Sequence, residues 1–151
     1  MKKRKIRKKK QNKRWIKKVR AVIYDVKNGE IYFLILHRVL RWKGWETLKE
    51  TLEKGETPLK ALKRGILEET GIENFRIIRN LKEKEKWSVK GNNYFITDTF
   101  LVRADMNQKI SLKQEIIEHD NYIWVSQKEA VKKITWPKTK KLFKKVKING
   151  E

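Results

Sequence analysis

The sequence predicts an α+β fold or an α/β/α sandwich. Short runs rich in β-branched and aromatic residues recur along the chain, one strongly marked helix interrupts them, and helical patterns follow the last run. Each run must bury an apolar face against another layer, which favours strands packed against helices. The chain has 151 residues, of which 38% are hydrophobic, and this is enough for one core of ordinary size.

The first two strands are expected at residues 19–26 and 30–40, which are rich in Val, Ile, Tyr and Leu. The turn between them contains Asn28 and Gly29. An Asn-Gly pair favours a tight hairpin turn because both positions need positive φ angles. The core is therefore expected to begin with this hairpin, and residues 42–48 are expected to form a further short extended segment.

One helix is marked at both of its ends. Thr57 is a suitable N-cap, Pro58 fits the first helical position, and Gly71 suits a left-handed C-terminal cap. Between these ends, Leu62 and Ile66 are four residues apart and therefore lie on one face. The sequence thus predicts a helix that begins at residue 58, ends before Gly71 and turns an apolar side toward the core.

The second half of the chain returns to strands and then to helices. The polar stretch at residues 105–120 is expected to form a surface loop over a functional site. Ser126 and Glu129 form a capping-box pattern for a helix through Ile134, and Pro137 begins a last, basic helix. Strands are expected at residues 75–81, 85–89, 94–103 and 122–125, with a turn at 90–93.

The formal net charge is +22, and most of it lies at the two ends of the chain. Residues 1–20 carry 13 Lys and Arg and no acid, residues 128–148 carry nine Lys and one acid, and the stretch between them is nearly neutral. Such like charge repels itself unless a polyanion neutralises it, which implies nucleic acid, ribosomal RNA included, or an anionic surface as a partner. A solubilising or targeting tail is the alternative.

The basic N-terminal extension, residues 1–18, has few apolar side chains and is expected to be disordered unless RNA orders it. A domain is expected at residues 19–148, including a basic C-terminal helix at about 137–148. Trp15 lies among basic residues and suits stacking on a base. The residues expected to contact RNA are Lys2, Lys3, Arg4, Lys5, Arg7, Lys8, Lys9, Lys10, Lys13, Arg14, Trp15, Lys17, Lys18, Arg20, Lys140, Lys141, Lys144 and Lys145.

Composition excludes several kinds of site. The chain has no cysteine, so disulfides, thiolate metal sites and cysteine nucleophiles are ruled out. No apolar run approaches the ~18–20 residues that cross a bilayer, and the N-terminus lacks the apolar region of a signal peptide. We therefore expect an intracellular, cytoplasmic protein with no membrane partner, which binds any metal through oxygen or through one of two histidines.

The residues from Glu50 to Ile72 give the most specific signal. A loop that carries Glu53 and Glu56 beside a helix that carries Glu68 and Glu69 could offer the oxygen ligands that Mg²⁺ prefers. This stretch resembles the Nudix box, G-x5-E-x7-R-E-U-x-E-E-x-G-U, in which U is an aliphatic residue. The matching residues are Glu56, Arg64, Ile66, Glu68, Glu69, Gly71 and Ile72.

The resemblance to Nudix hydrolases covers roughly residues 18–147 and is nearest to the diadenosine tetraphosphate hydrolase branch. Trp45 and Lys49 before the box, and the stretch from Glu118 to Val125 after it, look like that branch. The resemblance implies an α/β/α sandwich with a central mixed sheet, a Mg²⁺ or Mn²⁺ cofactor and a nucleotide ligand. It also implies Glu69 and Glu118 as catalytic groups, Glu68 and Glu69 as metal ligands, Arg64 and Glu56 as orienting residues, and Lys49 and Tyr94 as nucleotide contacts.

Two positions depart from the box. Glu50 stands at its opening glycine, a position that in the family lends only its backbone carbonyl to the metal. Gly65 stands where the family has a glutamate that acts as a metal ligand or a general base, and glycine has no side chain for either role. Loss of such a group typically lowers the rate by a few orders of magnitude, so the sequence predicts impaired catalysis.

Two functions remain open from the sequence. The first is a Nudix-fold protein with a degenerate, impaired site that acts as an RNA-binding component of a ribonucleoprotein such as the ribosome. Under this hypothesis, Gly65→Glu is expected to raise the activity of a nearly inert protein. The second is an active Mg²⁺-dependent hydrolase of dinucleoside polyphosphates or related nucleoside diphosphate derivatives.

Overall fold

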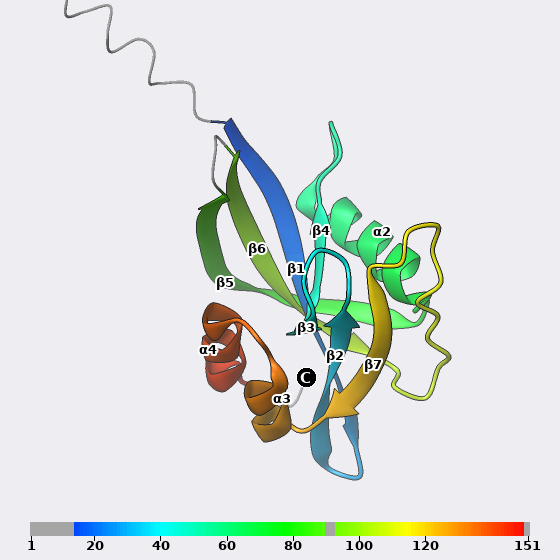
Figure 1. Cartoon of the computed structure of the whole chain (residues 1–151). Helices are drawn as coiled ribbons and strands as arrows, with labels where there is room; N and C mark the ends of the chain where they lie inside the picture. The colour runs from blue at the N-terminus through cyan, green and yellow to red at the C-terminus, as the bar shows by residue number, and fades with distance from the viewer. Residues whose placement is uncertain (1–13, 90–92, 150–151) are drawn as a thin grey trace, which may run out of the picture.

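A mixed seven-stranded sheet forms the centre of the molecule (Figure 1). The computed structural model describes residues 14–89 and 93–149. The strands are β1 (Arg14–Lys27), β2 (Glu30–Arg38), β3 (Gly44–Glu46), β4 (Leu48–Thr51), β5 (Phe75–Val89), β6 (Asn93–Ala104) and β7 (His119–Val125). They follow the order β3-β2-β1-β6-β5, while β4 pairs with β1 and β7 with β2. The β1–β6 pair is parallel and the β1–β2 and β5–β6 pairs are antiparallel, which makes the sheet mixed.

Helices cover the sheet on both sides. The helices are α2 (Pro58–Thr70), α3 (Gln127–Lys133) and α4 (Pro137–Lys145). Figure 1 shows α2 on one side of the central strands and α3 with α4 on the other. The predicted α/β/α sandwich with a central mixed sheet is therefore confirmed. No helix among the described residues has the length and apolar composition needed to span a bilayer.

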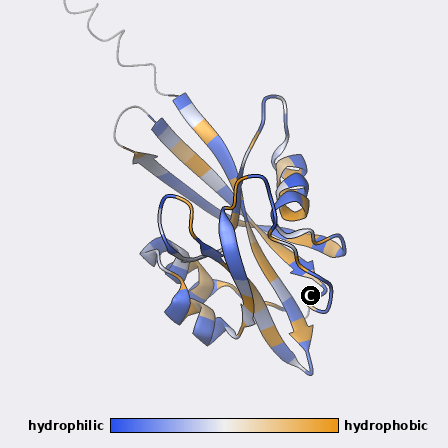
Figure 2. Ribbon diagram, turned by 45° about the vertical axis from the view of Figure 1, so that its right-hand side comes forward, coloured by the Kyte–Doolittle hydropathy of each residue, from blue (hydrophilic) through white to orange (hydrophobic). Residues whose placement is uncertain are grey.

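The central strands have apolar residues on both faces because both faces are covered. In β1, Val19, Ala21 and Ile23 belong to the core that also contains residues of α2, and Val22 and Tyr24 belong to the core that contains residues of α3 and α4. Side chains alternate along a strand, so a strand buried on both sides reads as a continuous apolar run. Figure 2 shows apolar residues along the central strands, while the helices carry hydrophilic residues on their outer sides.

The caps predicted for the main helix are present. The Thr57 side chain accepts a hydrogen bond from the Lys60 backbone N–H at 3.2 Å. At the other end, Gly71 has a φ of 70° and its N–H donates to the Leu67 carbonyl at 2.8 Å. These two caps fix where α2 begins and ends, and they therefore fix the direction in which its glutamates project.

The structure places several boundaries differently from the sequence analysis. β1 begins at Arg14, inside the segment 1–18 that was expected to lie outside the domain, because Arg14 to Lys18 pair in register with β6. The ring of Trp15 also contacts the ring of Tyr94, with centroids 5.4 Å apart. β7 begins at His119, so the polar loop is shorter than expected, and α4 ends at Lys145. Residues 1–13 and the predicted turn residues 90–92 lie outside the described residues.

Candidate active site

Arg64 holds the loop between β4 and α2 in place. Its guanidinium donates two hydrogen bonds to the Glu56 carboxylate, from Nε at 2.8 Å and from Nη2 at 2.9 Å. Nη2 also donates to the Thr51 carbonyl at 2.9 Å. The hydrogen bonds from Arg64 lower the pKa of Glu56 to about 2, so this pair stays charged at neutral pH. This ion pair therefore anchors the loop to α2.

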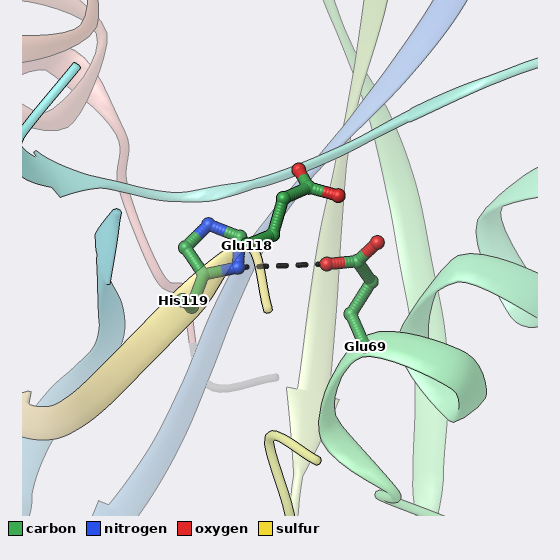
Figure 3. Close-up of side chains that lie close together, drawn as sticks. All are labelled: Glu69, Glu118 and His119. Atoms are coloured by element: carbon green, nitrogen blue, oxygen red, sulfur yellow. Dashed lines mark ion pairs between the residues drawn. The ribbon is translucent and has the colours of Figure 1, made fainter. Parts of the chain in front are cut away.

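Two carboxylates and an imidazole meet where α2 approaches the start of β7 (Figure 3). Glu69 projects from α2, and Glu118 and His119 come from the chain where β7 begins. One ligand atom from each of the three residues lies within 4.8 Å of the others. Glu69 is 6% exposed and His119 is 3% exposed, whereas Glu118 is half-buried. The sequence-predicted residues Glu69 and Glu118 are therefore brought together.

His119 is a buried counter-charge within this group. Its Nε2 lies 2.7 Å from Glu46 Oε2, and its Nδ1 lies 3.5 Å from Glu69 Oε1. Burial disfavours the charged ring, but the contacts with Glu46 and Glu69 outweigh it and raise the pKa of His119 to about 9. His119 is consequently an imidazolium at neutral pH. The protonated ring offsets the charge of the Glu46 and Glu69 carboxylates.

The carboxylates near His119 fit a hard divalent cation. Glu69 Oε1 is buried and makes no hydrogen bond to any of the described residues. Burial raises the pKa of Glu118, and the Glu69 charge raises it further against the opposing effect of Arg38. Oxygen donors are the ligands that Mg²⁺ and Mn²⁺ prefer. Glu69 and Glu118 are therefore suited to hold one of these ions.

Glu50 fills the space beside Gly65. A Cβ atom added to Gly65 would lie 2.9 Å from Glu50 Cβ, 3.1 Å from its Cγ and 3.3 Å from its Oε1. The Glu50 carboxylate also lies 3.3 Å from Arg64 Nη1 and accepts a hydrogen bond from the Thr51 N–H at 3.2 Å. The sequence assigned Glu50 a backbone role alone, whereas the structure places its side chain against α2, beside position 65.

This contact predicts an unusual response to Gly65→Ala. Alanine inside a helix is normally more stable than glycine by about 1 kcal/mol. Here the new Cβ crowds Glu50, so Gly65→Ala is expected to lower the free energy of unfolding by about 1–3 kcal/mol. In a Glu50→Gly background, the same substitution is expected to raise it by about 1 kcal/mol. Urea denaturation of the four proteins measures this, and stabilisation of the wild-type background by Gly65→Ala would show that the two side chains do not compete.

A cleft of 720 Å³ connects these carboxylates with basic and aromatic side chains. Trp87 and Phe95 line it and stack on each other, with ring centroids 4.1 Å apart. Lys49 Nζ lies 5.6 Å from the centre of the Trp87 ring, and burial lowers the pKa of Lys49. The acidic residues in the lining are Glu50, Glu69, Glu115 and Glu118, and the basic residues are Lys18, Arg38, Arg41 and Lys49.

Three expected contact residues do not lie in this cleft. The ring of Tyr94 contacts Trp15, while the next residue, Phe95, lines the cleft, because successive side chains of β6 point to opposite faces. The Glu68 side chain is 57% exposed and lies 3.2 Å from Arg64 Nη1. Arg20, expected to bind RNA, is instead buried and ion-paired with Glu85. These placements correct the expectations for Tyr94 and Arg20 and leave Glu68 outside the carboxylate group.

The remaining basic residues divide into three groups. Those from Lys2 to Lys13 lie outside the described residues. Arg14, Trp15 and Lys17 are exposed on the first residues of β1, whereas Lys18 lines the cleft. On α4, Lys141 and Lys144 are exposed, Lys145 is ion-paired with Glu83 at 3.0 Å, and the Lys140 ammonium donates to the Lys132 carbonyl at 3.2 Å.

Sequence reasoning missed the Glu50 side chain, Arg38, Trp87 and Phe95 as parts of the cleft. For Glu50 a signal was present, since the two departures from the box are an added carboxylate and a lost one. The other three residues come from strands that carry no motif, and only the sheet register brings them together.

Comparison with known proteins identifies the family. A sequence model of the NUDIX domain matches residues 15–146, which is most of the chain. The chain belongs to the NUDIX family. An RNA pyrophosphohydrolase from Sulfurovum sp. (strain NBC37-1) is 33% identical over 138 residues, covering 85% of this chain and 87% of that protein.

Solved NUDIX structures share the fold. The binary complex of the C. elegans Ap4A hydrolase superposes with a TM-score of 0.74 and 24% identity, covering 85% of this chain and 93% of that chain. The E. coli dihydroneopterin triphosphate pyrophosphohydrolase gives a TM-score of 0.70 and 18% identity, with coverages of 85% and 92%. The predicted relation to the Nudix superfamily is thereby confirmed.

Proposed function

We propose that this NUDIX protein is an active, divalent-cation-dependent hydrolase that cleaves a pyrophosphate bond at the 5′ end of an RNA. One observation carries the proposal: a single cleft brings the carboxylates of Glu69 and Glu118 together with basic side chains and a stacked pair of aromatic rings. Carboxylates suit a cation, basic side chains suit a polyphosphate, and aromatic rings suit a nucleobase. The proposed activity differs from the impaired catalysis that the residues at positions 50 and 65 of the box predicted.

Each part of the cleft has a chemical task. Lys18 and Lys49 line the cleft and are suited to pair with phosphate oxygens, and the stacked rings of Trp87 and Phe95 form an aromatic wall against which a nucleobase can pack. A bound Mg²⁺ or Mn²⁺ would neutralise phosphate charge and acidify the attacking water. Glu118 is half-buried beside Glu69, so one oxygen of its carboxylate can hold the cation while the other accepts a proton from that water.

Two observations support RNA over a free nucleotide. The relative from Sulfurovum is an RNA pyrophosphohydrolase. In addition, the exposed Arg14 and Lys17 at the start of β1 lie close in the chain to Lys18, which lines the cleft, so a phosphate chain longer than one nucleotide could contact them. A dinucleoside polyphosphate is the second candidate substrate, favoured by the likeness in fold to the C. elegans Ap4A hydrolase.

The rival function is an RNA-binding component of a ribonucleoprotein, such as the ribosome, with little or no turnover. Its support is the charge of +22, which exceeds what a small cleft needs. The two functions differ in one property. The hydrolase releases product many times per molecule, whereas the rival binds RNA without changing it.

An assay with short RNAs separates these functions and the two substrates. With Mg²⁺, the protein is expected to release pyrophosphate or phosphate from 5′-triphosphate RNA with a higher kcat/KM than from the matching free nucleoside triphosphate or from a dinucleoside polyphosphate. Binding of 5′-monophosphate RNA of the same sequence, which carries no pyrophosphate bond, provides the affinity control. Preference for the dinucleoside polyphosphate would overturn the RNA assignment and retain the hydrolase.

The basic N-terminal residues are expected to strengthen RNA binding through phosphate contacts. Deletion of residues 1–13 is the appropriate variant, because a deletion through residue 18 would also remove strand residues of β1. For single-stranded RNA, a plot of the logarithm of the affinity against the logarithm of the salt concentration falls with a slope of about 0.7 for each phosphate contact. The deletion is expected to remove several phosphate contacts and to make this slope correspondingly shallower. An unchanged slope would show that these residues do not bind the RNA.

A further inference from the structure

Position 65 in α2 and position 50 in β4 share one space, and only one of them has a side chain there. The shortest distance from a Cβ built at Gly65 is 2.9 Å to Glu50 Cβ, and Glu50 Oε1 lies at 3.3 Å. Glu50 cannot withdraw easily, because its backbone is paired with Val19 in the β1–β4 ladder. The Glu50 carboxylate therefore occupies the region into which a side chain from position 65 would extend.

We propose that Glu50 supplies the carboxylate that Gly65 lacks, so that Glu50, Glu69 and Glu118 together form the cation site. The box has glycine at position 50 and glutamate at position 65, and this chain has the same two residues in the reverse order, with the carboxylate on β4 in place of α2. The inference rests on the proposed hydrolase function and adds a ligand that the box would not assign.

The surroundings of Glu50 support this role. Glu50, Glu69 and Glu118 line the same cleft. Position 65 and Glu69 are one turn apart on α2, and the Glu50 side chain fills the space beside position 65. One ligand atom of Glu69 and one of Glu118 lie within 4.8 Å of each other, and Glu69 Oε1 is buried without a hydrogen bond to any described residue. Oxygen donors of this kind suit a divalent cation.

The contact also explains why the two departures occur together. With any larger residue at position 65, the Glu50 side chain would have to leave its present place. With glycine at position 50 and glycine at position 65, this region of the site would contain no carboxylate. Each departure is therefore tolerable because the other is present, although glycine within a helix is unfavourable by itself.

Arg64 offers another explanation for the position of the Glu50 carboxylate. Its Nη1 lies 3.3 Å from Glu50 Oε2, so Glu50 could serve only to neutralise Arg64. In that case its loss would affect stability and leave cation binding unchanged. Cation affinity is therefore the measurement that separates a ligand from a structural ion pair.

The test uses the full chain and measures Mn²⁺ binding by electron paramagnetic resonance together with turnover of 5′-triphosphate RNA. Glu50→Gln keeps the side-chain volume beside Gly65 and removes the charge. It is expected to weaken Mn²⁺ binding by at least about tenfold and to lower kcat by about 10²-fold or more. The matched control is Glu73→Gln, which removes an exposed carboxylate just beyond the end of α2.

The exchange variant Glu50→Gly with Gly65→Glu returns the carboxylate to the helix. It is expected to bind Mn²⁺ within about threefold of the wild-type affinity, whereas Gly65→Glu alone is expected to bind more weakly because Glu50 blocks its side chain. If Glu50→Gln binds Mn²⁺ as tightly as wild type while wild type turns over RNA, the inference is overturned and the proposed function stands. If wild type neither binds Mn²⁺ nor turns over substrate, the proposed function itself fails.

Discussion

Glu69→Gln is expected to lower kcat for the Mg²⁺-dependent release of product by about 10³-fold. Glu69 is 6% exposed, one of its oxygens is buried without a hydrogen bond to any described residue, and three further carboxylates line the same cleft. Glutamine has nearly the same volume and can still contact His119, so the fold is expected to be kept. Steady-state turnover of 5′-triphosphate RNA and Mn²⁺ titration of the same preparations provide the two measurements.

Neighbouring carboxylates provide the comparison for this prediction. Glu68→Gln alters an exposed group that contacts Arg64 outside the cleft, and it is expected to change kcat by less than about tenfold. Glu73→Gln controls for the general effect of removing one negative charge. An equal loss from Glu68→Gln and Glu69→Gln would contradict the arrangement of the site described here.

The pair of His119 and Glu46 is expected to make the stability of the metal-free protein depend on pH. The pKa of His119 is raised to about 9 in the folded protein, compared with about 6.5 in an unfolded chain. The folded state therefore binds the proton more tightly, and this contribution to stability is complete below pH 6.5 and is lost as the pH rises through about 9. It amounts to about 3 kcal/mol of the free energy of unfolding.

Urea denaturation in EDTA at several pH values measures this contribution. Burial also lowers the pKa values of Lys18 and Lys49, so the relevant quantity is the difference in stability between wild type and His119→Gln, which both contain these lysines. The variant is expected to be less stable at neutral pH, and the gap is expected to narrow above about pH 9. A gap that stays constant from pH 6.5 to pH 10 would show that His119 is not held as an imidazolium.

The sequence predicted the main helix and the first hairpin because their signals are local, whereas the strands expected at residues 75–81 and 85–89 are one strand, β5. The caps at Thr57 and Gly71 and the turn at Asn28 and Gly29 depend on neighbouring residues, and the structure contains all of them. The extent of β1 was not predictable in this way. Residues such as Lys17 and Lys18 become strand residues through pairing with β6, about eighty positions away in the chain.

The candidate site was predictable where a motif names its residues and not where packing decides. The box identified Glu69, Arg64 and Glu56, and the residues after it identified Glu118. It also led to the expectation that Gly65→Glu alone raises activity, and the 2.9 Å approach to Glu50 removes the ground for that expectation. The contact between positions 50 and 65 joins a strand to a helix, and residue spacing within a single strand or helix cannot predict such a contact. Phe95 and Tyr94 show the same limit, because sheet geometry decides which of two adjacent aromatic rings faces the cleft.

The central claim is that the cleft of this chain catalyses hydrolysis despite glycine at position 65. The most direct measurement is the number of product molecules released per protein molecule from 5′-triphosphate RNA in Mg²⁺, with EDTA and Glu69→Gln as blanks. We predict sustained turnover by the wild-type protein that EDTA abolishes. Tight RNA binding with no more product than in the Glu69→Gln blank would contradict the claim and favour the ribonucleoprotein role.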